Sequence, residues 1–173
     1  HTVIESTPSG MISLSPDTVS CPAAAPGETL RVDFADVRRS SIAPSNDLSG
    51  PAGSFIDIPH VIVAGTKGLA SLSASIPAGW VEVFYRDNDA DGRLGAADSL
   101  LRASDLALDP DSAGFATVPV IVRVFVPPQA GAGTNVSLAI ALVQILSGTA
   151  IQTEASVVDR LARRVGEAPQ DAG

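Results

Sequence analysis

Turns that contain glycine or proline recur along the whole chain, and the segments between them are too short for a helical bundle. Val, Ile, Leu, Ala, Ser and Thr dominate these segments, while aromatic residues make up only 4% of the sequence. Several segments alternate apolar and polar residues, which is the period of a half-buried strand rather than of a helix. Some eight or nine strand candidates without a long helix predict an all-β protein.

The clearest strand candidate is residues 29–37, in which apolar and charged residues alternate. Residues 55–63 are predicted to form a mostly apolar strand interrupted at Pro59, and the Ser-, Pro- and Gly-rich residues 40–53 a surface loop. The remaining strand candidates are 11–14, 69–76, 80–86, 115–126, 135–146 and 149–158, the last with a helical turn after it.

This number of strands favours an antiparallel β-sandwich of immunoglobulin-like type, with a barrel as the alternative. Residues 115–126 and 135–146 are expected to pair as a hairpin-like unit across a proline- and glycine-rich loop. The predicted organisation is an extended N-terminal arm over residues 1–10, a sandwich over 11–165 and a polar tail over 166–173.

An acidic stretch at residues 87–98, D-N-D-A-D-G-R-L-G-A-A-D, has the spacing of a calcium-binding loop. Calcium takes six to eight oxygen ligands, and glycine at the sixth position permits the sharp turn that such a loop needs. The alternative is an acidic turn that binds nothing. The predicted metal ligands are the side chains of Asp87, Asp89, Asp91 and Asp98 and the carbonyl of Arg93.

The segment before this loop, residues 80–86, is β-branched and aromatic, so the loop is expected to connect strands rather than the paired helices of a calcium sensor. Asp98 replaces the usual glutamate and has a shorter side chain, which predicts the weak affinity of extracellular calcium sites. A single loop indicates a structural ion rather than a signalling switch.

The composition of the chain limits the kinds of partner that it is expected to bind. The net charge is −8 with a single lysine, Lys67, so no positive stripe is available for nucleic acid. No apolar stretch is long enough to predict a membrane-spanning helix.

Cys21 is alone and cannot form an internal disulfide, which leaves a packed thiol or a bridge between subunits. The chain begins with His1 rather than Met, and together with the weak calcium loop this favours a secreted or cell-surface location.

Several motifs occur in an order typical of one family. They are P-G-E-T-L at 26–30, P-A-G-W at 77–80, Y-R-D at 85–87 running into Asp91-Gly92, and V-P-P-Q-A-G-A-G at 126–133. Over about residues 20–160 the chain resembles the bacterial immunoglobulin-like conserved-repeat domains of cell-surface proteins. The resemblance implies a stalk or adhesin module without catalysis. A single copy and the long 40–53 segment favour a self-assembling surface subunit instead.

Strand donation is a route to such assembly, because an extended arm from one subunit can add to a sheet edge of the next. The predicted subunit-interaction residues are Val3, Ile4, Met11, Ile12 and Leu14. An ordinary first strand is the alternative. The expected partner is therefore the chain itself, as a homo-oligomer or a polymer such as a filament, pilus-like fibre or surface layer.

The rival hypothesis is a secreted copper-binding β-sandwich, since a terminal histidine can bind copper through its amine and ring. His1 would need a second histidine, and His60, the other one in the chain, lies in an apolar context that is more typical of a structural imidazole. Hydrolase motifs, among them a G-x-S-x-G elbow, are absent from the sequence, so the chain is not expected to be an enzyme.

Overall fold

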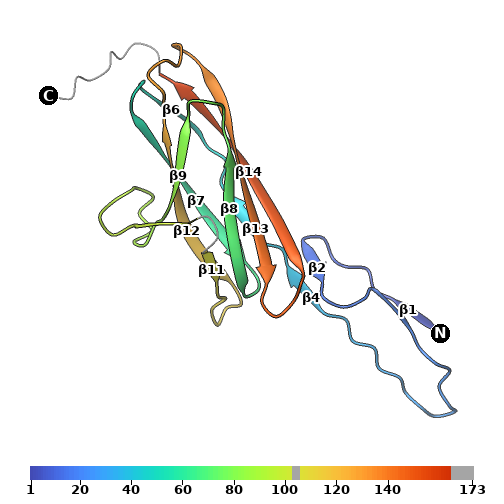
Figure 1. The fold of residues 1–173 in the computed structure, drawn as a ribbon. Coiled ribbons are helices and arrows are strands. Elements are labelled where there is room, and N and C mark those ends of the chain that lie inside the picture. The colour runs from blue at the N-terminus through green and yellow to red at the C-terminus, as the bar shows by residue number, and fades with distance from the viewer. Residues whose placement is uncertain (103–105, 165–173) are drawn as a thin grey trace. The chain divides into compact units, whose positions relative to one another are not determined.

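The computed structural model describes residues 1–102 and 106–164, and contacts within the chain divide it into two units, with the boundary after Arg39. The larger unit begins at Ser40 and is a sandwich of two five-stranded sheets (Figure 1). The predicted all-β, antiparallel, immunoglobulin-like sandwich is confirmed, and the two separate sheets rule out the barrel alternative.

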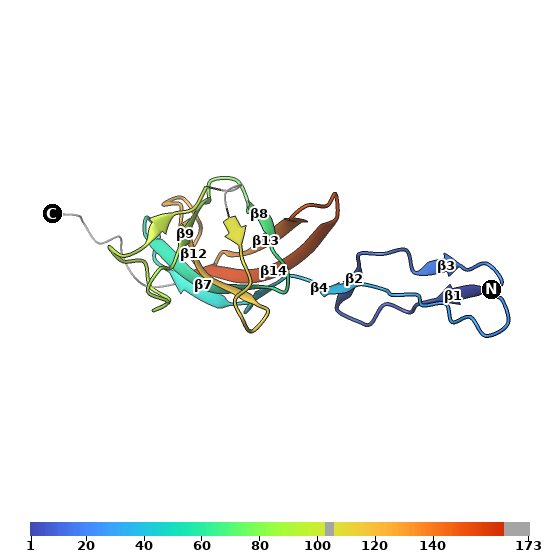
Figure 2. The same cartoon turned by 90° about the horizontal axis from the view of Figure 1, so that it is seen from below.

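The two sheets take their names from their central strands, β12 and β13 (Figure 2). The β12 sheet has the order β10 (Ser99–Leu100), β9 (Val81–Arg86), β12 (Ala116–Phe125), β7 (Phe55–Ala64) and β5 (Ser41–Ala43). The β13 sheet has the order β11 (Leu106–Leu108), β8 (Gly68–Ser75), β13 (Asn135–Leu146), β14 (Gln152–Arg163) and β6 (Asp47–Gly50). All neighbouring strands in the two sheets are antiparallel except β6 and β14, which are parallel.

The inner faces of the two sheets form the core, because every second residue of the long strands is buried and, apart from His60 on β7 and Gln144 on β13, apolar. Ile58 on β7 and Val122 on β12 are fully buried on one side, and Ile140 and Leu142 on β13 on the other. Burial of side chains of this size contributes about 1.5–3 kcal/mol each. Trp80, just before β9, also joins this core and is 7% exposed.

The predicted surface loop at residues 40–53 is wrong, because this segment contributes an edge strand to each sheet. β5 pairs with β7, and β6 pairs with β14 in the opposite sheet. Ile42 of β5 is buried in the core, which supplies the apolar contact that the Ser-, Pro- and Gly-rich composition conceals. The chain therefore crosses from one sheet to the other between Ala43 and Asp47.

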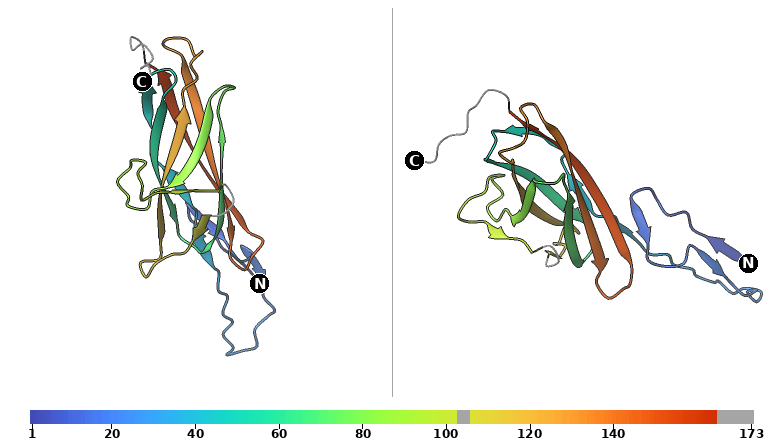
Figure 3. Two further views of the ribbon diagram at one scale, coloured as in Figure 1. Left: turned by 60° about the vertical axis from the view of Figure 1, so that its left-hand side comes forward. Right: turned by 45° about the horizontal axis from the view of Figure 1, so that its top comes forward.

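The hairpin predicted from residues 115–126 and 135–146 is also wrong. The strands exist as β12 and β13, but they lie in different sheets, and the proline- and glycine-rich loop passes between the sheets. Each strand has one buried face and pairs on both sides, so its partners come from elsewhere in the sequence. β13 and β14 are paired along nearly their whole length (Figure 3).

β14 continues as a strand to Arg163, so the helical turn predicted after residue 158 does not form. Alternate residues of β14, including Thr153, Val157 and Leu161, are buried against the core, which fixes the period at two. The polar tail predicted for residues 166–173 lies outside the described residues. Within residues 1–102 and 106–164, no helix is long and apolar enough to cross a membrane.

A buried histidine–aspartate pair joins the two sheets where the chain crosses over. His60 on β7 and Asp159 on β14 both have fully buried side chains, and His60 Nε2 lies 3.1 Å from Asp159 Oδ2, although the two atoms are not aligned as a hydrogen bond. The other carboxylate oxygen accepts hydrogen bonds from the backbone N–H of Asn46 (2.7 Å) and from its side-chain amide (3.2 Å).

His60 Nδ1 lies 2.9 Å from the Pro44 carbonyl, which can only accept, so Nδ1 carries a proton. The pair thereby fixes the crossover segment, since Pro44 and Asn46 bond to opposite members of it.

The smaller unit, residues 1–39, has two short antiparallel ladders: β1 (Thr2–Ile4) with β3 (Thr18–Ser20), and β2 (Met11–Ser13) with β4 (Asp36–Arg38). All of its residues are described, and none of them is buried. The strand predicted at residues 29–37 is therefore mostly wrong, since only Asp36–Arg38 pairs. The contacts place residues 11–39 in this unit, whereas the sequence predicted a sandwich that starts at residue 11.

Replacement of Asp159 by alanine should destabilise the sandwich by about 3–5 kcal/mol, because it leaves His60 and the Asn46 N–H buried without their partner. Chemical denaturation of the variant and the parent protein measures this difference. Asp109→Ala is the matched control, since Asp109 forms an exposed pair with Lys67, and its loss should cost less than about 1 kcal/mol. Equal effects of the two substitutions would contradict the role given to Asp159.

Candidate metal centre

The acidic loop at residues 87–98 is held by strands at both ends, as the sequence predicted. β9 ends at Arg86, and the Asp87 N–H continues its ladder by donating to the Pro119 carbonyl at 3.2 Å. At the far end, Ser99 of β10 pairs with Arg86, which brings the two ends of the loop together. The loop therefore starts and finishes at one edge of the β12 sheet.

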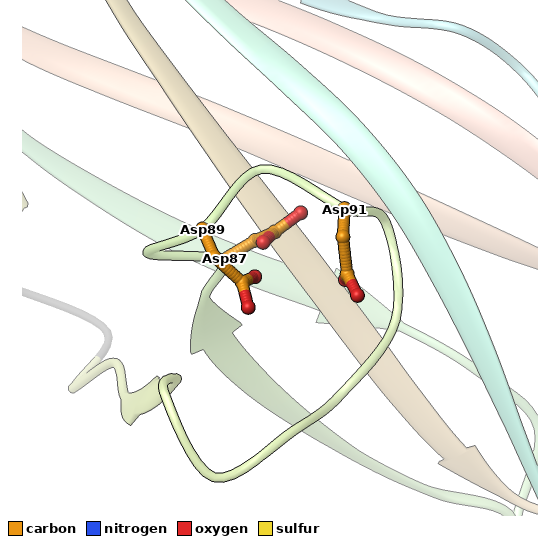
Figure 4. A group of neighbouring side chains, drawn as sticks. All are labelled: Asp87, Asp89 and Asp91. Atoms are coloured by element: carbon orange, nitrogen blue, oxygen red, sulfur yellow. The ribbon is translucent and has the colours of Figure 1, made fainter.

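Three carboxylates converge inside this loop (Figure 4). Asp87, Asp89 and Asp91 each offer an oxygen atom, and these atoms all lie within 4.8 Å of one another. Hard divalent cations such as calcium prefer ligand sets of this kind. Predicted ligands at the first, third and fifth loop positions are thus brought together.

Asp87 is the most unusual member of the cluster, because its side chain is carried into the protein by the end of β9 and the residue is only 5% exposed. One carboxylate oxygen accepts a hydrogen bond from the Gly92 N–H at 2.9 Å. The other, Oδ1, is shielded from solvent and has no hydrogen-bond partner within the described part of the chain. A buried carboxylate oxygen without a donor is unfavourable unless a cation compensates it.

The backbone is shaped to wrap the cluster. Gly92 has φ 74° and Ala90 has φ 57°, so both adopt the left-handed region. Gly92 does so without steric cost, as the loop spacing predicted, whereas Ala90 costs roughly 1 kcal/mol or more. Gly92 also lies against Pro59 of β7, because a Cβ atom at Gly92 would come within 3.6 Å of the Pro59 Cβ. The loop thus rests on the outer face of the β12 sheet.

Asp98 is not part of the three-carboxylate cluster. Its two oxygens accept hydrogen bonds from the backbone N–H groups of Asn88 (2.9 Å) and Gly95 (2.7 Å), which tie the end of the loop to its beginning. Arg93 donates its N–H to Asp91 at 2.7 Å. Direct coordination by Asp98 and by the Arg93 carbonyl stays a prediction.

The charges of the cluster act on one another. The pKa of Asp89 is raised from its ordinary value of 3.8, first by loss of solvent around the carboxylate and then by Asp91, by a hydrogen bond to Asp87 that needs a proton on Asp89, and by the charges of Asp98 and Asp87. Without a cation, the ionised form of Asp89 is thus disfavoured in the folded protein.

The predicted subunit-interaction residues do not form a single extended arm. Val3 and Ile4 lie in β1 and pair with Val19 and Thr18, while Met11 and Ile12 lie in β2 and pair with β4. Leu14 follows β2 and donates its N–H to the Ala35 carbonyl at 2.7 Å. Ile4 remains 73% exposed, and Val3 and Leu14 are 38% and 36% exposed.

His60 is unavailable to the copper hypothesis, because its buried ring is engaged by Pro44 and Asp159 as described above. The structural interpretation of this histidine is therefore confirmed. The amine of His1 donates to the carbonyl of Cys21 at 3.0 Å, and Cys21 is a half-buried free cysteine.

No protein-family model matches the sequence, and a comparison with curated proteins yields no significant match. The resemblance to the conserved-repeat domains therefore stays a prediction.

The solved structures reported next resemble this chain only weakly, both in sequence identity and in TM-score. The major pilin subunit of Bacillus cereus is 8% identical, with 88% of this chain and 52% of the pilin covered and a TM-score of 0.49. A non-cellulosomal cohesin from Archaeoglobus fulgidus is 14% identical, with 78% and 95% covered and a TM-score of 0.44. A family 123 glycoside hydrolase from Clostridium perfringens is 8% identical, with a TM-score of 0.48, and the match covers 72% of this chain but only 27% of the hydrolase. At these TM-scores and identities the similarities carry no argument about activity or partners.

Asp89→Asn should raise the melting temperature of the metal-free protein at neutral pH. Because the pKa of Asp89 is higher in the folded protein than the ordinary value of 3.8, ionisation of this carboxyl lowers the free energy of unfolding. The loss begins as the pH rises past 3.8 and reaches its full size above the folded-state pKa. Well below pH 3.8 the carboxyl is protonated in both states, so the variant and the parent should melt alike. Thermal unfolding in a chelator across this pH range measures the difference. A constant difference at all pH values would contradict the electrostatic cause.

Proposed function

We propose that the chain is an exported structural subunit of a cell-surface assembly, with a β-sandwich stabilised by calcium at the 87–98 loop. The observation that carries the calcium proposal is the buried Asp87 carboxylate, which converges with those of Asp89 and Asp91 and whose Oδ1 has no hydrogen-bond partner among the described residues. A divalent cation would neutralise three converging charges and satisfy this oxygen at the same time.

The proposed ligands are the side chains of Asp87, Asp89 and Asp91, with the Arg93 carbonyl and Asp98 completing the set. Asp98 accepts two backbone hydrogen bonds, so it would act either through a water molecule or after a local rearrangement. A bound ion would fix the loop where it rests on Pro59 and would stiffen the connection between β9 and β10. Such an ion supports structure rather than catalysis.

A location outside the cell fits this chemistry. The ligand set contains aspartates with short side chains, and one of them is already occupied by the backbone, so the expected affinity is that of sites that fill at millimolar calcium. The order of motifs shared with the surface conserved-repeat domains supports the same location. The proposed partner is a second copy of the chain, assembled by strand donation.

Calcium should raise the melting temperature of the parent protein, because an ion that binds only the folded state stabilises it by mass action. At a free concentration of about 100 times the dissociation constant the gain is roughly 2.7 kcal/mol. Asp87→Asn should abolish most of this gain, while Asp109→Asn, which alters an exposed acid outside the loop, should leave it intact. Melting curves with and without calcium measure the effect, and a parent protein indifferent to calcium and to chelator would overturn the assignment.

Electron microscopy and light scattering of the purified protein at millimolar calcium test the assembly proposal. We expect filaments, lattices or discrete oligomers whose fraction grows with protein concentration. A protein that stays monomeric up to high concentration would refute self-assembly without affecting the calcium proposal.

A further inference from the structure

The β13 sheet has a long unpaired edge. β14 pairs with β13 from Gln152 to Ala162, but on its other side β6 reaches only Arg160–Arg163. Within the described ranges, no strand pairs with the second side of β14 between Gln152 and Val158, although β5 of the opposite sheet lies close to β14. An edge of this length is a template for another strand unless it is protected.

The backbone groups of this edge point outward in a regular way. The Arg160 N–H donates to the Asn46 carbonyl, on the side of β14 where β6 lies. Because backbone groups alternate in direction along a strand, the N–H and C=O groups of every second residue before Arg160 face the same side. These residues are Gln152, Glu154, Ser156 and Val158, and their side chains are all exposed.

The smaller unit holds the complementary feature, an unpaired segment with the pattern of a strand. In residues 29–34, T-L-R-V-D-F, apolar residues alternate with Arg31 and Asp33. No ladder and no backbone hydrogen bond is found for residues 29–34 among the described residues. Leu30 is 46% exposed, Val32 and Phe34 are half-buried, and the exposed side chains of Arg31 and Asp33 pair with each other at 2.8 Å. The strongest strand pattern of the sequence thus lacks a partner in its own unit.

We propose that residues 29–34 of one copy add as a strand to the free edge of β14 in a second copy. This inference rests on the proposed self-assembly and assigns the donated strand to residues 29–34 rather than to the arm at residues 3–14. Backbone hydrogen bonds supply the affinity in this mode of recognition, and alternate side chains supply the register.

The opposite charges of Arg31 and Glu154 and the two-residue alternation of both segments favour a register in which Arg31 lies opposite Glu154. Directly opposite residues share a face of the sheet, so Arg31 and Asp33 face solvent with Glu154 whether the added strand is parallel or antiparallel. Leu30, Val32 and Phe34 then lie on the inner face, the side on which Thr153 and Val157 of β14 are buried. A shift by one residue would expose the three apolar side chains and bring the charges inward.

The edge also has space at its end. A cavity of about 360 Å³, lined by Ser45, Asn46, Asp47, Val158 and Arg160, opens where β6 begins beside β14. In the parallel orientation of this register Phe34 lies opposite Val157, so the added strand would end beside this cavity and would not have to displace β6.

A charge-reversal cycle tests the register. Arg31→Glu and Glu154→Arg should each weaken self-association roughly fivefold, because each places like charges opposite one another, and the double variant should restore it. Arg102→Glu changes the same charge outside both segments and should have no effect. Analytical ultracentrifugation across protein concentrations measures association. Failure of the double variant to recover would overturn the Arg31–Glu154 register.

Ser156→Pro tests the edge itself. Its N–H faces the free side, so proline there removes a donor for an incoming strand while the ladder with β13 is retained. We expect self-association to fall on the order of tenfold or more with an unchanged melting temperature of the monomer. If the parent assembles and this variant assembles equally well, the edge is not the acceptor and the proposed self-assembly survives. If the parent does not assemble, both proposals fail.

Discussion

The His60–Asp159 pair is the interaction on which the arrangement of the sandwich depends. Apolar burial holds two sheets face to face, but it is non-directional and does not fix where the chain passes between them. The buried pair does so, because its hydrogen bonds to Pro44 and Asn46 are met in only one placement of the crossover. β5 and β6 can then serve as edge strands of opposite sheets, and beyond β6 the second side of β14 has no partner strand among the described residues.

The acidic loop at residues 87–98 is held by the same framework, on the outer face of the β12 sheet. β9, β12 and β7 form a rigid surface, and the acidic loop leaves it at Asp87 and returns at Ser99. A carboxylate at the very end of a strand is placed by the ladder before it and not by its own preferences. This is why Asp87 is buried while Asp89 and Asp91 remain exposed.

The sequence predicted the parts of this structure that depend on local pattern. Six strands of the sandwich, β7, β8, β9, β12, β13 and β14, follow from alternation and turn residues, and the loop between strands follows from its spacing. Partners could not be predicted, because pairing depends on residues far apart in the chain: β12 and β13 carry equally good hairpin patterns yet lie in different sheets. The same limit hid the His60–Asp159 pair, although a histidine inside an apolar run was already a hint.

Two errors have a common physical origin. Residues 40–53 have a loop-like composition but form two strands, whereas residues 29–35 have an ideal strand pattern but form none. In the first case Ile42 is buried in the core and the backbone pairs with β7 and β14. In the second case residues 29–34 have no backbone partner among the described residues. Strand propensity describes fitness for a pleated, half-buried surface, and a single chain does not always supply that surface.

The parallel pairing of β6 and β14 has a mechanical consequence. β6 lies near the start of the sandwich and β14 at its end, so tension applied between residues 40 and 164 pulls these two strands in opposite directions along their length. Their hydrogen bonds lie across that direction and are loaded together in shear instead of opening one after another. A sandwich built in this way resists stretching along the axis on which a surface fibre would carry its load.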